Sequence, residues 1–390
     1  MKKLVSILCA AALALSLAGC GAQAADTNTN TNTTAPVVST VYSLEDATVL
    51  TFTDSGITAQ DGGTGYEIDG TALTIDSAGT YAVTGTCADG SITIKEGTTG
   101  VTLVLNGLSL TSADTAPITC NKSTEVTIIA AEGSVNSLTD SARNNDDEYP
   151  DNEAAENAVI KCKDGSQVTL GGTGSLTITA NGKNGIKSGT TTAEEWEASL
   201  TIRELTLTIN APVNDAVNAE QTLNVESGTL TIAAADDALH SDLVLNIGAE
   251  GTEGPAITIT QCYEGIEGAE LNIYSGDISI NSSDDCLNAA NSDLSGNDFT
   301  MTISGGTIVA CSASGDGFDS NGDLTITGGS VTVWTANTAD NQPLDADGTI
   351  TVSGGTVLAA GGSSGMSMNL TATQPCVIFG SSGGMGGGPN

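Results

Sequence analysis

Short runs of alternating apolar and polar residues fill the chain from about residue 45 onward. Examples are Leu223-Asn224-Val225, Leu271-Asn272-Ile273 and Leu324-Thr325-Ile326. A turn pair such as Ser227-Gly228 or Gly328-Gly329 follows many runs, and a second short run follows the turn. Alternation with a period of two between Gly-containing turns predicts short β-strands that each bury one face.

A five-residue motif, named the cassette here, recurs among these runs. It consists of an acid or amide, a small residue, an apolar residue, a polar residue and a small residue. Its apolar third positions, residues 186, 217, 239, 266, 287, 318 and 344, are 31, 22, 27, 21, 31 and 26 residues apart. The copies are Asn184-Gly185-Ile186-Lys187-Ser188, Asp215-Ala216-Val217-Asn218-Ala219, Asp237-Ala238-Leu239-His240-Ser241, Glu264-Gly265-Ile266-Glu267-Gly268, Asp285-Cys286-Leu287-Asn288-Ala289, Asp316-Gly317-Phe318-Asp319-Ser320 and a worn Gln342-Pro343-Leu344-Asp345-Ala346.

Weaker copies upstream, Ala116-Pro117-Ile118-Thr119 and Asn157-Ala158-Val159-Ile160, extend the series. One cassette and about three short strands per repeat are typical of coils stacked on coils. We therefore predict an all-β fold, a right-handed, single-stranded parallel β-helix (solenoid), over residues 41–379. The third cassette position should point inward, and the first and fourth should point outward.

The ends of the chain predict export. Lys2 and Lys3 precede a short apolar run, and Leu17-Ala18-Gly19-Cys20 resembles the bacterial lipobox. Residues 1–20 are expected to form a lipoprotein signal peptide, with Cys20 as the lipid anchor on the extracellular face of the bacterial membrane. An ordinary signal, cut after Ala22 or Ala24 to release a secreted protein, is the alternative. Residues 21–40, rich in Thr and Asn, predict a disordered linker, and the Gly-rich residues 380–390 predict a flexible tail.

The charge is strongly negative. The formal net charge of −37 comes from 47 acids against 10 bases, and no Lys or Arg follows Arg203. Such a surface repels nucleic acid and anionic membranes and attracts cations, so no nucleic-acid partner is expected and membrane contact is expected through the anchor alone.

Stacked cassettes would place acids in a column at the strand spacing of about 4.8 Å, where they repel unless a cation lies between them. Oxygen ligands favour Ca²⁺, and His240, the single histidine, excludes a zinc site built on several histidines. The alternative is that each Asp or Asn stabilises a turn by bonding its own backbone. The candidate metal ligands are Asp215, Asp236, Asp237, Glu264, Glu267, Asp284, Asp285, Asn288, Asp316, Asp319 and Asp345.

The cassettes resemble a known family, the carbohydrate-binding domain-containing, polysaccharide-lyase-like β-helix proteins of clostridial bacteria. The resemblance rests on the motifs around Asp236-Asp237, Glu264, Asp284-Asp285 and Asp316 and spans roughly residues 40 to 370. It implies a right-handed β-helix with bound calcium, surface display, and binding of cellulose or an acidic plant polysaccharide such as pectin. His240, Asn288 and Asn218 stand where the family pattern suggests acids.

We therefore expect a monomeric, calcium-dependent carbohydrate-binding protein without catalytic residues or an organic cofactor. A lyase or hydrolase acting on pectin-type uronans is the main alternative. A lyase base is not evident on the acidic column, and Lys183, Lys187 and Arg203 at its upstream margin are the nearest candidates. Hydrolysis could use Asp236 with Asp237 or Asp285. A structural adhesin that binds a protein partner is the third hypothesis.

Overall fold

The computed structural model describes residues 44, 46–60, 62–292, 294, 298–336, 341–362 and 370–377, all within one unit, residues 37–390. The predicted signal peptide with Cys20, the linker and the tail lie outside the described residues. Every helix or strand assigned in the described part is a strand, and 32 strands form one continuous, mostly parallel sheet. No described segment has the helical length and apolarity that crossing a membrane would require.

The strands stack in three parallel ladders that the chain visits in turn, as a solenoid-like series of coils. The cassette ladder contains β4 (Ala72–Ile75), β6 (Ser91–Ile94), β8 (Ile118–Cys120), β11 (Ala158–Cys162), β14 (Asn184–Ser188), β17 (Val217–Ala219), the first halves of β20 (Leu239–Ile247) and β22 (Ile266–Ile273), β24 (Leu287–Ala289) and β27 (Phe318–Ser320).

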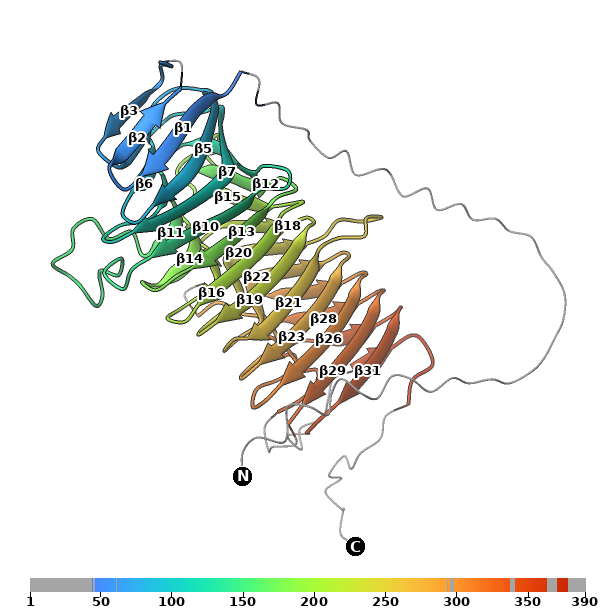
Figure 1. The fold of residues 1–390 in the computed structure, drawn as a ribbon. Coiled ribbons are helices and arrows are strands. Elements are labelled where there is room, and N and C mark those ends of the chain that lie inside the picture. The colour runs from blue at the N-terminus through green and yellow to red at the C-terminus, as the bar shows by residue number, and fades with distance from the viewer. Residues whose placement is uncertain are drawn as a thin grey trace, which may run out of the picture. The chain divides into compact units, whose positions relative to one another are not determined.

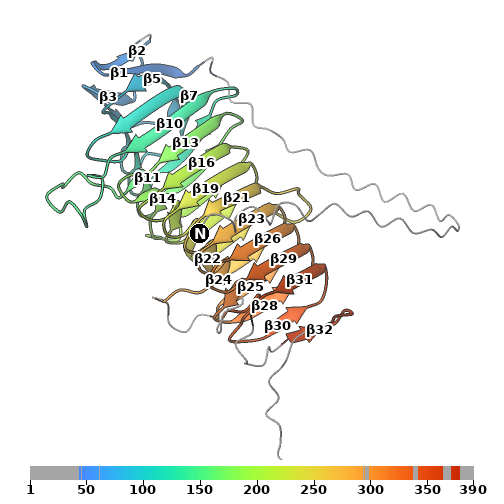
Figure 2. The same cartoon turned by 60° about the horizontal axis from the view of Figure 1, so that its bottom comes forward.

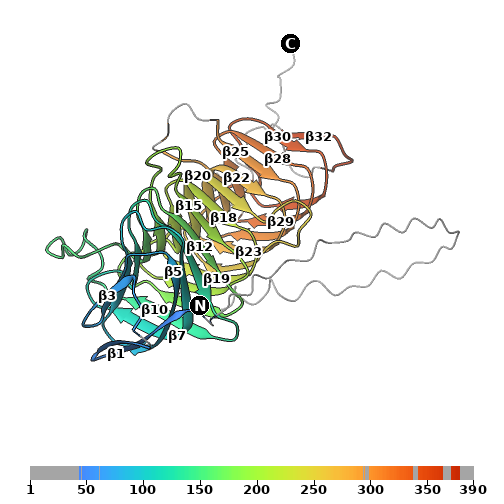
Figure 3. The ribbon, with the colours of Figure 1, turned by 90° about the horizontal axis from the view of Figure 1, so that it is seen from above.

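The second ladder contains β1 (Thr48–Thr53), β5 (Gly79–Cys87), β7 (Val101–Ser112), β9 (Glu125–Ala130), β12 (Gln167–Gly171), β15 (Ser199–Ile202), β18 (Thr222–Val225), the second halves of β20 and β22, β25 (Thr300–Ile303), β28 (Asp323–Ile326), β30 (Ile350–Val352) and β32 (Leu370–Ala372). Figure 3 shows its labels running in order from β12 to β32.

The third ladder continues from the second halves of β5 and β7 through β10 (Val135–Asp140), β13 (Ser175–Thr179), β16 (Thr206–Ala211), β19 (Thr229–Ala234), β21 (Ala256–Gln261), β23 (Asp277–Ser282), β26 (Thr307–Ser312), β29 (Ser330–Thr335) and β31 (Thr356–Ala360). Its strands form the long row in Figure 1, and Figure 2 brings β11, β14 and β24 of the cassette ladder into view.

Two antiparallel pairs occur at the N-terminal end of this stack. β2 (Gly56–Ala59) pairs with β1, and β3 (Tyr66–Asp69) pairs with β4. The described sheet is thus parallel except where the winding begins. The handedness and the single-stranded character of the winding stay predictions.

The core lies between the ladders, because alternate residues of each strand point inward. The third cassette positions from Ile186 to Phe318 are fully buried, and the register pairs each with its counterpart in the next coil. The predicted spacings and the inward third position are confirmed. Parallel in-register stacking therefore lines the interior with columns of aliphatic side chains.

The upstream cassette register is one residue later than predicted. Ile160, not Val159, pairs with Ile118 on one side and Ile186 on the other. Both Val159 and Ile160 are buried, so apolar patterning alone cannot distinguish the two registers. The shift places Lys161 in the fourth cassette position.

Glycine pairs turn the chain between the second and third ladders for two separate reasons. A β carbon on Gly328 would overlap the carbonyl oxygen of Ser304 in the preceding coil. Gly329 has a φ of +81°, which L residues with a side chain rarely adopt. The first glycine therefore permits close stacking of coils, and the second permits the turn.

We predict that Gly328→Ala lowers the free energy of unfolding by about 1–3 kcal/mol, because the added methyl group forces adjacent coils apart. Thr327→Ala, at the preceding exposed position, is the matched control and should change little. Denaturant unfolding of both variants measures the difference, and equal stability would show that the coils are not packed this tightly.

Candidate functional site

The side chains at the fourth cassette positions form one column along the cassette ladder. The first and fourth cassette positions together are named the cassette column here. Each side chain is the register partner of the next, and the sign of charge changes along the series. In order, the fourth positions are Lys161, Lys187, Asn218, His240, Glu267, Asn288 and Asp319. Lys187 lies at the upstream margin of the acidic positions, as expected, and Lys161 precedes it as a second lysine.

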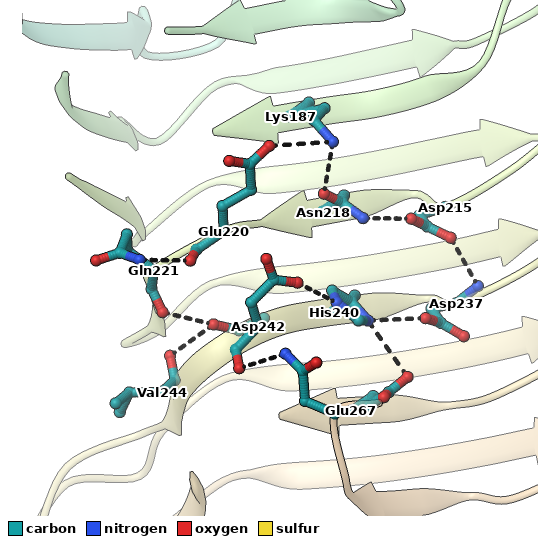
Figure 4. Close-up of polar contacts among 12 residues, drawn as sticks. Lys187, Asp215, Asn218, Glu220, Gln221, Asp237, His240, Asp242, Val244 and Glu267 are labelled. Carbon is teal, nitrogen blue, oxygen red and sulfur yellow. Dashed lines mark hydrogen bonds and ion pairs between the residues drawn. The ribbon is translucent and has the colours of Figure 1, made fainter. Parts of the chain in front are cut away.

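A chain of polar contacts joins the lysine end to the acids (Figure 4). Lys187 Nζ lies 3.3 Å from Asn218 Oδ1 and 3.4 Å from Glu220 Oε1. The Asn218 amide donates to Asp215 Oδ2 at 2.6 Å, and Asp215 Oδ1 accepts from the backbone N–H of Asp237 at 3.1 Å. Neighbouring coils are thus connected by side chains as well as by the strand ladder.

His240 lies among three carboxylates. Its Nδ1 is 2.9 Å from Asp237 Oδ2 and 3.3 Å from Glu267 Oε2, and its Nε2 is 2.8 Å from Asp242 Oδ1. Burial opposes protonation of His240, but these hydrogen bonds outweigh it and raise its pKa to about 12. The imidazolium therefore offsets part of the negative charge of Asp237, Glu267 and Asp242, and a metal ion in this coil would compete with it for the same oxygens.

Two further clusters consist of carboxylates alone. Asp316, Asp319 and Asp345 each offer an oxygen within 4.8 Å of the others, and all three side chains are half-buried. The second cluster, Asp215, Asp236 and Asp237, shares Asp237 with His240. Carboxylate oxygens converging at this spacing match the donors that hard cations such as Ca²⁺ or Mg²⁺ prefer.

Glu264, Asp285 and Asn288 lie in the coils between these two clusters. The Asn288 amide nitrogen donates to Glu264 Oε2 at 2.8 Å, whereas its oxygen Oδ1 is buried and has no hydrogen-bond partner. An acceptor left unpaired in this way costs free energy, and a bound cation would remove the cost.

Burial raises the pKa of several acids in the coils that follow His240. It raises the pKa of Glu264 to about 9 despite the Asn288 hydrogen bond, with Glu267 and Asp237 adding to the shift. Burial followed by neighbouring acids raises the pKa of Asp285 to about 7 and that of Asp319 to about 6. Ionising these groups without a counterion is therefore unfavourable.

The first cassette positions do not point into solvent as predicted. Asp215 is 4% exposed, because its carboxylate bonds the backbone of the next coil, and Asp237 is 8% exposed, with its carboxylate against His240. Asp285 likewise accepts the backbone N–H of Asp316, which follows 31 residues later. The turn-stabilising alternative is thus partly correct, but the backbone that these acids bond belongs to the neighbouring coil.

Asp284 accepts a hydrogen bond from the hydroxyl of Tyr263 and belongs to none of the three clusters. The sequence interpretation missed Asp242, although Asp242 follows the single histidine by two residues. It also missed Lys161, since the register there was assigned one residue early. All eleven candidate ligands lie in or beside the cassette column, but the structure groups only part of them closely.

A model of the carbohydrate-binding domain-containing protein family matches residues 69–365, which includes every cassette. The chain belongs to this family. The resemblance seen in the cassettes is therefore confirmed, and the match supports binding of polysaccharide in general terms.

Among solved structures, the chain is similar to a polysaccharide lyase-like protein from C. thermocellum, solved as a gadolinium derivative. The identity is 22%, the TM-score is 0.40, and the alignment covers 83% of this chain and 97% of that chain. No curated protein sequence matches this chain.

The raised pKa values give the metal-free protein a defined pH dependence. Between the ordinary carboxylate pKa of about 4 and the raised values of Glu264, Asp285 and Asp319, the folded state binds more protons than the unfolded state. Stability from these groups is complete below about pH 4 and is lost as the pH rises through 6, 7 and 9. His240 acts in the same direction, since its raised pKa makes its contribution fall above about pH 6.5.

We predict that the melting temperature in excess chelator falls steadily between pH 5 and pH 8. Glu264→Gln should reduce the slope, whereas Glu226→Gln, at an exposed position outside the column, should leave it unchanged. A melting temperature that rises with pH over this range would contradict the buried, protonated state of these acids.

Proposed function

We propose that this protein binds an acidic plant cell-wall polysaccharide of the pectin type in a calcium-dependent manner, by means of the cassette column of a right-handed, single-stranded β-helix. The observation that carries the proposal is the Asp316, Asp319 and Asp345 cluster, in a chain of the carbohydrate-binding domain-containing family. Three converging carboxylates provide half or less of the six to eight oxygens that Ca²⁺ takes. The remaining positions are available to water and to the carboxylate of a uronate.

Calcium bridging resolves a problem of charge. A chain with a net charge of −37 repels a polyanionic glycan unless cations lie between them. A divalent ion held by the column neutralises the protein's own acids and presents positive charge outward. Binding of a uronate by this route needs no basic side chain beside the metal.

An acidic glycan is favoured over crystalline cellulose. Flat glucan surfaces suit a row of exposed aromatic rings, and the described residues present no such row. Trp334 is exposed on β29 of the third ladder, whereas Tyr263 is exposed in the turn that precedes the cassette ladder. The two rings therefore belong to different ladders.

We predict that Asp319→Asn weakens calcium binding about tenfold or more, because it removes one charged ligand from the cluster. Asp277→Asn, at an exposed position of β23 in the third ladder, is the matched control and should bind calcium as the wild type does. Equilibrium dialysis with metal analysis measures the affinity of each protein.

The same proteins should be applied to polygalacturonate and cellulose columns in calcium and in chelator. We expect calcium-dependent retention of the wild type and the control on polygalacturonate, and weaker retention of the Asp319 variant. Equal retention in calcium and in chelator would rule out calcium bridging. Release of unsaturated, ultraviolet-absorbing products would instead favour a lyase.

We further propose display on the extracellular face of the bacterial membrane through a lipid on Cys20. The lipobox-like Leu17-Ala18-Gly19-Cys20 supports this placement. We expect Cys20→Ser to abolish incorporation of a labelled fatty acid and to move the protein from the membrane fraction to the medium. Cys9→Ser, inside the apolar run, is the matched control, and a protein that stays unlabelled without any substitution would exclude the anchor.

A further inference from the structure

Lysines are concentrated at the N-terminal end of the cassette column. Four of the ten basic residues of the chain, Lys161, Lys163, Lys183 and Lys187, lie on β11 and β14 or beside them. Two of them, Lys161 and Lys187, are register partners and therefore neighbours at strand spacing on the column itself. A like-charged pair side by side is unusual in a protein with so few bases.

The acids nearest this pair already form ion pairs with Lys163 or with Lys187 itself. Lys163 lies 2.7 Å from Glu156, and Lys187 lies 3.4 Å from Glu220. The side chain of Lys161 forms no hydrogen bond or ion pair with any residue that the structure describes. Its charge is therefore left without a direct counterion.

The position of Lys161 makes this isolation costly. Its side chain is half-buried between Ile160 and Cys162, which point into the core. Burial, followed by repulsion from Lys187, lowers the pKa of Lys161. An anion placed against both lysines would remove the repulsion and restore the charged form.

We propose that Lys161 and Lys187 form a carboxylate-binding subsite for one uronate residue of an acidic polysaccharide. This subsite rests on the proposed function. It adds direct binding of a uronate carboxylate by ammonium groups to the binding through calcium at the acidic part of the column. It also gives the bound chain a direction, since one uronate lies at the lysines and the following ones lie toward the acids.

The contacts between the two parts support a continuous site. Lys187 bonds Asn218, and Asn218 bonds Asp215, whose other oxygen accepts the N–H of Asp237. Asp215 and Asp237 belong to one of the all-carboxylate clusters. The ammonium group of Lys187 and a candidate metal cluster thus lie along the same ladder within two coils of each other (Figure 4).

The test measures the affinity for trigalacturonate by calorimetry in saturating calcium. Lys161→Met should bind it about tenfold more weakly, the loss expected for one charged hydrogen bond. Lys161→Arg should restore most of the affinity, because the guanidinium group also binds carboxylates. Lys95→Met, which removes an exposed charge after β6, is the matched control and should bind as the wild type does.

Two readouts distinguish loss of the subsite from loss of structure. Calcium affinity should be unchanged and the melting temperature should not fall in Lys161→Met, since the substitution removes an unpaired, half-buried charge that costs stability. In addition, wild-type protein with ¹³C-dimethylated lysines should show a shift of the Lys161 signal with galacturonate, but not with glucose, in excess chelator. This measurement requires neither calcium nor a substitution in the observed protein.

If Lys161→Met binds trigalacturonate as tightly as the wild type, the subsite is wrong and the calcium-dependent function stands. If the wild type binds no trigalacturonate in calcium, the proposed function fails, and the NMR titration alone decides the subsite. A Lys161 signal that is indifferent to galacturonate would then overturn the subsite as well.

Discussion

Parallel, in-register hydrogen bonding between coils is the constraint on which this structure depends. It places each residue directly against its counterpart in the next coil at a spacing of about 4.8 Å. For apolar positions this repetition is favourable, and columns such as Val217, Leu239 and Ile266 fill the core. For positions that approach the preceding coil, the same spacing excludes a β carbon, as at Gly328.

The same constraint divides stacked polar residues into those that can hydrogen-bond to their own kind in the next coil and those that cannot. Asn224, Asn246 and Asn272 are stacked on the second ladder. The Asn246 amide nitrogen donates to the oxygen of Asn224, and the Asn272 amide nitrogen donates to the oxygen of Asn246. Carboxylates lack a donor, so a stack of them needs protons or cations from elsewhere. Backbone N–H groups stabilise the first cassette positions, and His240 supplies a cation at one fourth position.

The sequence allowed the cassette ladder to be predicted in register from residue 186 to residue 318, because each cassette has a single large apolar residue and this leaves one alignment. The upstream register failed at Val159 and Ile160, where two adjacent apolar residues fit equally well and only strand pairing decides. The error had a functional consequence, because it hid Lys161. The burial of Asp215 was not predictable either, since it depends on a backbone N–H of a neighbouring coil that the local sequence does not reveal.

The order of charges along the column shows how a stack of similar coils can have two electrostatically different ends. Each coil offers the same fourth position, yet the occupants change from lysine through asparagine and histidine to acids. Because adjacent coils interact at strand spacing, a single substitution alters the local field of its two neighbours and leaves the backbone unchanged. A uniform column of acids would bind cations alike at every coil. The observed gradient places positive charge at one end of the column and negative charge at the other, and under the proposed function this asymmetry would distinguish a directional glycan site from a general cation-binding surface.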